Sequence, residues 1–144
     1  MPGYTPEVQE TDEEKNEIIF ALTLMRVLGD LKDKEALPII KKAWKEYGVS
    51  NQRIYYILTL AKLGDYRKIK LLINRLKQDY PAGSKEEEIK LRSEILGVIG
   101  EYLKTHPDKE LTGLVEFLSE EGQYPEIKNA ASKVLSSLGK TVKK

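Results

Sequence analysis

The 144-residue chain holds few residues that could carry out chemistry, and the most reactive types are almost absent. Without cysteine, it has no thiol nucleophile, no disulfide framework and no Cys-ligated metal. The one histidine, His106, is flanked by Thr105 and Pro107 on an expected connector, which favours a capping or solvent-exposed role over acid–base chemistry. One histidine cannot form a His-His metal pair. We therefore expect no catalytic residue, no metal site and no cofactor.

Clusters of charged residues are the next candidates for a site. Glu86, Glu87 and Glu88 open an expected helix, where carboxylates interact favourably with the helix dipole, so they are interpreted as a solvated face rather than as metal ligands. Five basic residues follow another expected helix and are interpreted as its solvated outer face, with acidic proteins or nucleic acid as the alternative: Arg67, Lys68, Lys70, Arg75 and Lys77. No glycine loop between a strand and a helix is present to hold a phosphate.

The net charge of +1 conceals an alternation along the chain. Residues 1–30 carry −5, 31–80 carry +7, 81–126 carry −6 and 127–144 carry +5. This pattern does not favour nucleic acid as the partner of the whole chain, and it lets neighbouring segments attract each other. No apolar run reaches the roughly 18 residues that cross a bilayer, so no membrane is expected and the predicted location is cytoplasmic. The predominance of Lys and Glu resembles thermophile usage.

Two series of glycines recur at a nearly fixed period. Gly29, Gly64, Gly100 and Gly139 each follow an apolar residue, with spacings of 35, 36 and 39 residues. A second series, at positions 48, 83 and 122, precedes the first by 16 or 17 residues. Since glycine readily adopts the left-handed conformation that ends a helix, both series are expected to mark chain reversals after helices. A repeat of this length predicts stacked helical units.

Helical periodicity fills the segments between these glycines. Apolar residues from Ile127 to Leu138 follow the i, i+3, i+4, i+7 pattern of an amphipathic helix, and Trp44 completes another such stripe as an expected core residue. Helix-start signals agree and lie at Thr11 with Glu14, at Ser84 with Glu87, and at Asp33, Ser50 and Pro125. Seven helices are predicted, near 12–28, 34–47, 51–63, 66–80, 85–104, 108–121 and 125–138.

Alignment on the first glycine series gives one kind of helix, called B, four times, with a shorter A helix in each interval. The B helices are expected at 15–28, 50–63, 86–99 and 125–138. A single A–B hairpin cannot bury both its apolar faces, so stacking of neighbours must create the core. The expected organisation is one domain, 1–144, composed of a flexible or capping segment 1–11, an unpaired B helix 12–29, hairpins 33–64, 65–100 and 104–139, and a basic tail 140–144. The unpaired first helix raises the possibility that the chain is a fragment of a longer array.

At this point the chain resembles the HEAT and HEAT-like family of helical repeats. The resemblance is carried by the motif Pro-Glu-Ile-Lys-Asn-Ala-Ala running to Val-Leu-Ser-Ser-Leu-Gly at 125–139, and by Leu-Gly-Asp leading to Glu-Ala-Leu-Pro-Ile-Ile at 28–40. Arg53 and Lys128 occupy the basic position near the start of the family's B helix. The resemblance implies an all-α fold, a right-handed α–α superhelix or solenoid of about three and a half HEAT-like repeats. It also admits a lyase-like or chromophore-handling protein.

Equivalent positions of the four B helices, off the core stripe, predict an inner face that changes in polarity. In the last two helices these positions are polar, and in the first two they are mostly apolar. The predicted partner-binding residues come from this comparison: Ile19, Leu22, Ile54, Ile57, Leu58, Lys90, Ser93, Glu94, Asn129, Ser132 and Lys133. Among them Ile54, Ile57 and Leu58 are expected to anchor a partner, and Lys90, Glu94 and Lys133 to select it by charge.

Three explanations of the apolar half remain open. Strong curvature or the segment from Tyr4 to Val8 could bury it, a homodimer could form through it, or a partner's helix or extended peptide could dock there. The predicted function is a non-catalytic scaffold or adaptor that binds a protein or peptide on the inner face of the B helices. A nucleic-acid-binding module using the basic segment 31–80 is the alternative, and a small lyase-like or chromophore-handling protein ranks third.

Overall fold

The structure is a computed structural model that describes residues 12–48 and 52–139, with side chains from Phe20 onward. Within these ranges the fold is all-α and no strand occurs, which confirms the predicted class. The elements are α1 (Asp12–Asp30), a 3-10 turn η1 (Lys34–Ala36), α2 (Leu37–Tyr47), α3 (Arg53–Lys62), α4 (Ile69–Lys77), α5 (Lys85–Thr105), α6 (Lys109–Glu121) and α7 (Pro125–Ser137). The predicted segments 1–11 and 140–144 lie outside the described residues.

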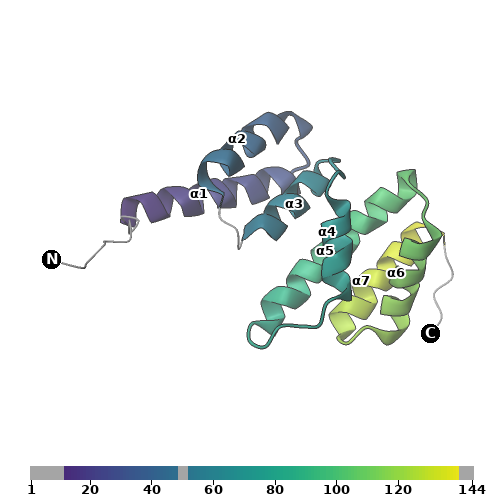
Figure 1. Cartoon of the computed structure of the whole chain (residues 1–144). Helices are drawn as coiled ribbons and strands as arrows, with labels where there is room; N and C mark the ends of the chain where they lie inside the picture. Colours follow the sequence, from purple (N-terminus) through teal and green to yellow (C-terminus); the bar gives the residue numbers. More distant parts are fainter. Residues whose placement is uncertain (1–11, 49–51, 140–144) are drawn as a thin grey trace.

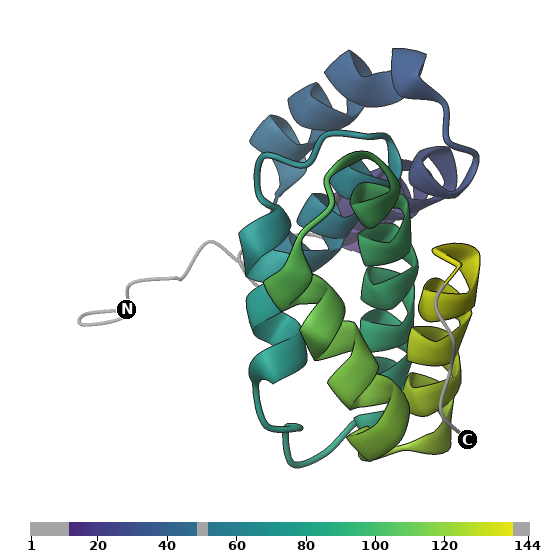
Figure 2. The same cartoon turned by 90° about the vertical axis from the view of Figure 1, so that its right-hand side faces the viewer.

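Alternate long helices pack in succession along the molecule. α1 contacts α3, α3 contacts α5, and α5 contacts α7, so residues far apart in the sequence meet through one connected row (Figure 1). Figure 2 shows α7 alongside α5, with α6 crossing in front of them. In the described chain α1 and α7 are not among the helix pairs that pack together, and Figure 1 places them at opposite ends. The row of helices is therefore open rather than closed on itself.

The remaining helices, α2, α4 and α6, cover this row unevenly. α4 packs on both α3 and α5, and α6 packs on α7, as two of the predicted hairpins require. α2 instead packs mainly on α1 and reaches α3 through Trp44, whose ring stacks on Tyr56 at 4.6 Å between centroids. The Trp44 side chain is half-buried at the edge of that contact. The first interval of the chain is thus built differently from the last.

Two clusters of buried apolar side chains form the core. The large cluster extends from α3 to α7 and includes the fully buried Leu72, Ile95 and Val115. The small cluster joins α1, α2 and α3 and contains Met25, Ala36, Ile40, Leu60 and Leu63. α3 belongs to both, because Leu60 and Leu63 enter the small cluster while Ile57, Leu58 and Ala61 enter the large one. Both sides of α3 are consequently buried.

Glycine ends the B helices at only some of the expected places. After α3, Gly64 has φ of +89° and its N–H donates to the Ala61 carbonyl, while the Asp65 N–H donates to Leu60 at 2.9 Å. These two bonds make a Schellman motif, in which the left-handed residue is favourably glycine. Gly139 has φ of +74° after α7 and fits the same prediction.

The prediction of a left-handed chain reversal is wrong at Gly29 and Gly100, which lie inside α1 and α5. A Cβ at Gly29 would come within 2.9 Å of Thr59 Cγ2, and one at Gly100 within 3.2 Å of Val134 Cγ2. These glycines therefore allow two helices to approach closely. α1 continues to Asp30, and the left-handed conformation follows at Lys32, with φ of 55°.

The second glycine series also departs from expectation at two positions. Gly48 and Gly122 follow α2 and α6 with φ of −64° and −55°, so neither is left-handed. A Cβ at either position would lie within about 2.5 Å of a carbonyl oxygen, of Trp44 and Leu118 respectively. Close approach of the backbone to the preceding helical turn, rather than φ, requires glycine there. Gly83, with φ of +118°, keeps the predicted positive φ.

Helix-start signals are fulfilled in part. The Asp33 carboxylate accepts the Glu35 N–H at 3.1 Å, and Pro125 occupies the first turn of α7. Ser84 precedes α5 but makes no side-chain capping bond, so the predicted capping box with Glu87 is wrong. Its ψ of 73° is not the extended conformation that directs a hydroxyl toward the free N–H groups. The predicted caps at Thr11 and Ser50 lie outside the described residues.

Candidate functional site

Two cavities lie on either side of α5. One cavity of about 460 Å³ lies between α5 and the ends of α1 and α3, and a second of about 490 Å³ lies between α5 and α7. Gly97 and Glu101 of α5 line both cavities, which together are here called the α5 groove. Its lining comes from α1, α3, α5 and α7 and from the chain after α1 and α3, and none of it from α2, α4 or α6.

Small residues make the floor of this groove. Gly97 lies in the middle of α5, where a Cβ would meet no atom within 4 Å. Gly29 and Gly64 line the part near α1 and α3, the first at a close helix crossing and the second in its Schellman turn. Gly64 and Gly97 are exposed, so their lack of a side chain keeps the groove open, whereas Gly29 is buried.

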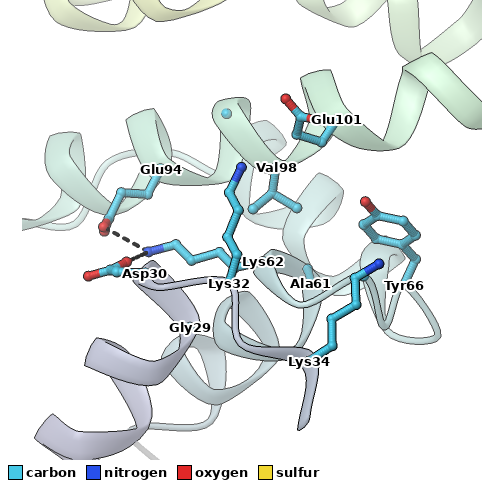
Figure 3. A pocket seen from close by; sticks show the side chains of 12 residues that line it. Gly29, Asp30, Lys32, Lys34, Ala61, Lys62, Tyr66, Glu94, Val98 and Glu101 are labelled. Carbon is cyan, nitrogen blue, oxygen red and sulfur yellow. Dashed lines mark hydrogen bonds and ion pairs between the residues drawn. The ribbon is translucent and has the colours of Figure 1, made fainter. Parts of the chain in front are cut away.

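Lys62 holds three helices together at one side of the groove. Its amine donates to Glu94 Oε1 at 3.1 Å and also pairs with Asp30, as the dashed lines in Figure 3 show. These partners lie on α5 and α1, while Lys62 lies at the end of α3. The Lys62 side chain is only 17% exposed, so the ion triad is a structural tie more than a free binding group.

Cationic and phenolic donors remain available beside this triad. Lys32 and Lys34 line the same cavity, are exposed, and form no ion pair with any described residue. In Figure 3 the Lys32 side chain rises toward Val98 and the Lys34 side chain extends toward Tyr66. Burial, and next the charge of Glu101, raises the pKa of the Tyr66 phenol, so the hydroxyl stays protonated at neutral pH. The arrangement suits a carboxylate or another anionic group of a ligand.

The other half of the groove is polar and mixed in charge. It is lined by residues of α5 and α7 that include Ser93, Glu126, Asn129 and Lys133. The Ser93 hydroxyl already donates to the Ile89 carbonyl at 2.8 Å, which leaves its lone pairs as acceptors. Asn129 and Lys133 are exposed, so their donors face solvent.

The structure brings together some of the predicted site residues. Ser93, Asn129 and Lys133 line one half of the α5 groove, and Glu94 lines the other half. Lys90 is exposed and Ser132 is half-buried, but neither lines the groove. The predicted polar side of the inner face is therefore partly assembled, with Glu94 already engaged by Lys62.

The apolar side of the predicted inner face is wrong as an accessible surface. Ile57 and Leu58 are 4% and 3% exposed, and they belong to the large core with residues of α4 and α5. Ile54 is partly buried against that core, and Leu22 is partly buried against the small one. Burial of α3 on both sides, in the small cluster on one and the large cluster on the other, is the physical reason. The side chain of Ile19 lies outside the described side chains.

Several groove residues were not predicted from the sequence: Asp30, Lys32, Lys34, Lys62, Tyr66, Gly97 and Glu101. A usable signal existed in the Leu-Gly-Asp triplet, which occurs at 28–30 and again at 63–65. An acidic residue follows the aligned glycine both times, Asp30 and Asp65, which indicates that the carboxylate has a role of its own. The periodicity alone predicts only a helix end at this position.

The acidic and basic clusters singled out from the sequence are partly consumed by internal ion pairs. Glu88 is 5% exposed, so the prediction of a solvated face is wrong for it: it pairs with Arg75 at 2.7 Å and with Arg92 at 2.8 Å. On α4 and the turn before it, Arg67 pairs with Asp65 at 2.7 Å, and Lys41 of α2 reaches the same carboxylate. The basic segment is thus partly neutralised by its neighbours.

The remaining chemical candidates do not form a reactive site. His106 is exposed, as predicted, and stacks on Tyr102 with 4.5 Å between ring centroids. Its Nδ1 lies 2.8 Å from the Thr105 hydroxyl. Within the described ranges no group of three His, Cys, Asp or Glu side chains could hold a metal ion. None of the helices in those ranges is both long and apolar enough to span a membrane.

Comparison with known proteins gives no precedent for this groove. No family model matches the chain, no curated protein is similar to it, and no solved structure matches its fold.

Proposed function

We propose that this protein is a non-catalytic scaffold that binds an extended, acidic peptide segment of a partner protein in the α5 groove. The observation that carries the proposal is that Gly97 and Glu101 line both cavities, one on each side of α5. Cavities lined in turn by α1, α3, α5 and α7 suit a chain laid across them better than a compact small molecule. Lys32 and Lys34 favour acidic side chains in the part of the ligand nearest α1.

A HEAT-like arrangement is part of the proposal. We infer that the A–B hairpins stack as repeats into a right-handed superhelix, with the groove on the side of the B helices. Two observations support this: the row of contacts α1–α3–α5–α7, and the equivalent helix crossings at Gly29 with Thr59 and Gly100 with Val134. Thr59 and Val134 each lie five residues before the next aligned glycine. The same packing contact therefore recurs along the chain.

Nucleic-acid binding by segment 31–80 receives less support from the side-chain contacts. Four of its basic residues, Lys41, Lys62, Arg67 and Arg75, are paired with carboxylates. A phosphate backbone would have to compete with those pairs, whereas an acidic peptide needs only the two unpaired lysines of the groove. A lyase-like or chromophore-handling role has no supporting side-chain constellation in the described ranges.

Filling the groove at Gly97 tests the proposal. Linear peptides of random sequence displayed on phage are selected on the wild-type protein, and the enriched peptides are synthesised and measured by fluorescence anisotropy. Gly97→Phe places a ring in the groove at a site where a side chain meets no atom, and the helix gains propensity from the loss of glycine. Its matched control is Gly113→Phe, at an exposed helical glycine of α6 that is equally free of neighbours.

The expected result is enrichment of acidic peptides whose Kd rises at least tenfold in Gly97→Phe and stays unchanged in Gly113→Phe. A parallel measurement with a 20-nucleotide single strand at 50 and 200 mM salt addresses the alternative. Equal peptide affinity in both variants would remove the α5 groove as the site. Tight, salt-dependent binding of the single strand, without enriched peptides, would favour the nucleic-acid reading instead.

A further inference from the structure

The end of the molecule formed by α1 and α2 carries five of the seven large apolar side chains that are exposed among the described residues. Phe20, Leu24, Val27 and Leu31 are 69%, 41%, 46% and 70% exposed, and Ile39 of α2 is 61% exposed. Only two other large hydrophobic side chains among those described are exposed, and they lie apart on α4 and α6. Five exposed apolar side chains at one end of the molecule indicate a contact site, because single exposed apolar residues are normally dispersed over a protein surface.

The four residues on and after α1 form a single seam. Their spacings of 4, 3 and 4 residues place them on one side of a helix, which is the pattern of a helix that packs against another helix. Beside the seam, a cavity of about 410 Å³ between α1 and α2 is lined by Phe20, Leu24 and Ile39 together with residues of the small core. Figure 1 shows the first half of α1 extending beyond the other helices.

The positions equivalent to Leu24 in the other three B helices are covered by a neighbouring helix, and Leu24 is not. The residue five positions before each aligned glycine is Leu24, Thr59, Ile95 and Val134 in turn. The last three are 3%, 0% and 5% exposed. In two cases the covering surface is a glycine of the preceding long helix, Gly29 over Thr59 and Gly100 over Val134. Leu24 is 41% exposed because no described helix takes that place beside α1.

We propose that a second copy of this chain covers the seam, with the two α1 helices packed antiparallel about a two-fold axis. A two-fold contact needs only one self-complementary surface, and the seam is symmetric in spacing about its centre. In that register Phe20 faces Leu31 of the second copy, and Leu24 faces Val27 of the second copy. Each copy thus supplies the missing helical neighbour of the other.

Charge distribution selects the antiparallel orientation. The sequence of the first turns of α1 is acidic, with Asp12, Glu13, Glu14 and Glu17, and segment 1–30 as a whole carries −5. Lysines 32 and 34 follow the other end of the helix, at the start of a segment that carries +7. Antiparallel packing brings the acidic first turns of one copy to the end of α1 where the basic segment of the other copy begins, and it also aligns the helix dipoles favourably. Parallel packing would place four acidic residues beside their own copies.

The size of the seam predicts a reversible dimer. A 19-residue helix is about 28 Å long, so one helical face with Ile39 gives an interface near the lower limit for specific complexes. We therefore expect a Kd on the order of micromolar. Neither Phe20 nor Phe117 lines the α5 groove, so variants at these positions test association without changing the peptide-binding residues.

Sedimentation velocity of the full chain between about 1 and 200 µM tests the association. Wild type is expected to shift from monomer to dimer, and Phe20→Glu is expected to weaken the dimer at least tenfold because it places a charge in the seam. The matched control is Phe117→Glu on α6, where the native ring is 57% exposed, and it should leave the dimer unchanged. A wild type that stays monomeric throughout, or equal weakening by both variants, would overturn the proposal.

Cross-linking tests the orientation, because the chain has no native cysteine. Phe20→Cys and Leu31→Cys proteins are mixed and oxidised, and each is also oxidised alone. Antiparallel packing predicts that the mixture cross-links faster than either protein alone, whereas parallel packing predicts the reverse. A chain lacking residues 1–11 is measured in parallel: dimerisation only after this truncation would identify that segment as the occupant and overturn the second copy.

Discussion

The two ends of this protein are both built from amphipathic helices, but they bury different numbers of apolar side chains. Eighteen buried residues form the large cluster from α3 to α7, whereas five form the small cluster of α1, α2 and α3. In the large cluster α3 and α5 each pack between two other helices of the row, and α7 packs on both α5 and α6. At the other end α1 buries Met25 and leaves Phe20 and Leu24 exposed. Whether the apolar face of such a helix is buried therefore depends on the helices packed beside it more than on its own sequence.

The largest expected effect compares two isoleucines that are both fully buried. Ile95→Ala in the large cluster should lower the free energy of unfolding by about 4 kcal/mol, because surrounding helices cannot collapse into the cavity. Ile40→Ala in the small cluster should cost about 2 kcal/mol, because the end helices can adjust. Urea unfolding followed by circular dichroism measures both values. An equal or larger loss in Ile40→Ala would show that the two clusters are equally rigid.

A smaller effect compares the buried carboxylates of the two regions. Hydrogen bonds from Arg75, and then from Arg92, hold the pKa of Glu88 below its usual range against the effect of burial. Near α2 and α3, hydrogen bonds from Arg67, and further from Lys41, hold the pKa of Asp65 well below its usual range. A lowered folded pKa contributes stability that is present above the ordinary carboxyl pKa of about 4 and is lost as pH falls through the folded value.

Neutral substitutions of these carboxylates should therefore flatten the loss of stability between about pH 5 and pH 2. At pH 7 we expect Glu88→Gln to cost about 2 kcal/mol, because it leaves the buried Arg92 without its ionic partner. Asp65→Asn should cost less than about 1 kcal/mol, since Arg67 remains in solvent. Urea unfolding across this pH range gives both quantities. Unchanged pH dependence in Glu88→Gln would exclude the proposed ion cluster as its source.

The smallest effects compare the ends of α1 and α3. Each helix is followed by a residue in the left-handed conformation, which is Lys32 after α1 and Gly64 after α3. Gly64→Ala should destabilise the protein by about 1 kcal/mol, because its φ of +89° is unfavourable for a residue with a Cβ. Lys32→Gly should stabilise it by about 0.5 kcal/mol, since lysine there occupies the left-handed position that glycine prefers. Thermal unfolding should shift in opposite directions, and shifts of the same sign would contradict the assigned motifs.

The helices could be predicted from the sequence because hydrophobic periodicity and helix-start and helix-end residues depend on local interactions. The stripe from Ile127 to Leu138 and the Pro125 start signal identified α7 closely, and α5 was expected at 85–104 where the structure has 85–105. α4 is shorter than predicted, 69–77 rather than 66–80, because residues 65–68 form a turn in which Asp65 accepts the Arg67 N–H. Local capping chemistry overrode the apolar pattern there.

The site was less predictable because it depends on how each helix is rotated. Alignment on glycine assumed that equivalent positions face the same way in every B helix, which placed Ile57 and Leu58 on an inner surface. In the structure α3 is covered on both sides, and those residues enter the large core. Conversely, Phe20 and Leu24 occupy aligned core positions but are exposed. The helices packed beside a given helix determine which of its side chains are buried, and a single sequence does not specify those helices.

Hydrogen exchange measured at two protein concentrations tests this contrast most directly. We predict that amides of α5 and α7 exchange slowly and independently of concentration, because their partners lie within the chain. Amides of α1 and α2 should exchange rapidly at about 1 µM and become protected at about 200 µM, when a second copy covers the seam. If α1 is as protected as α5 at the lower concentration, the first helix is complete by itself and the account is contradicted.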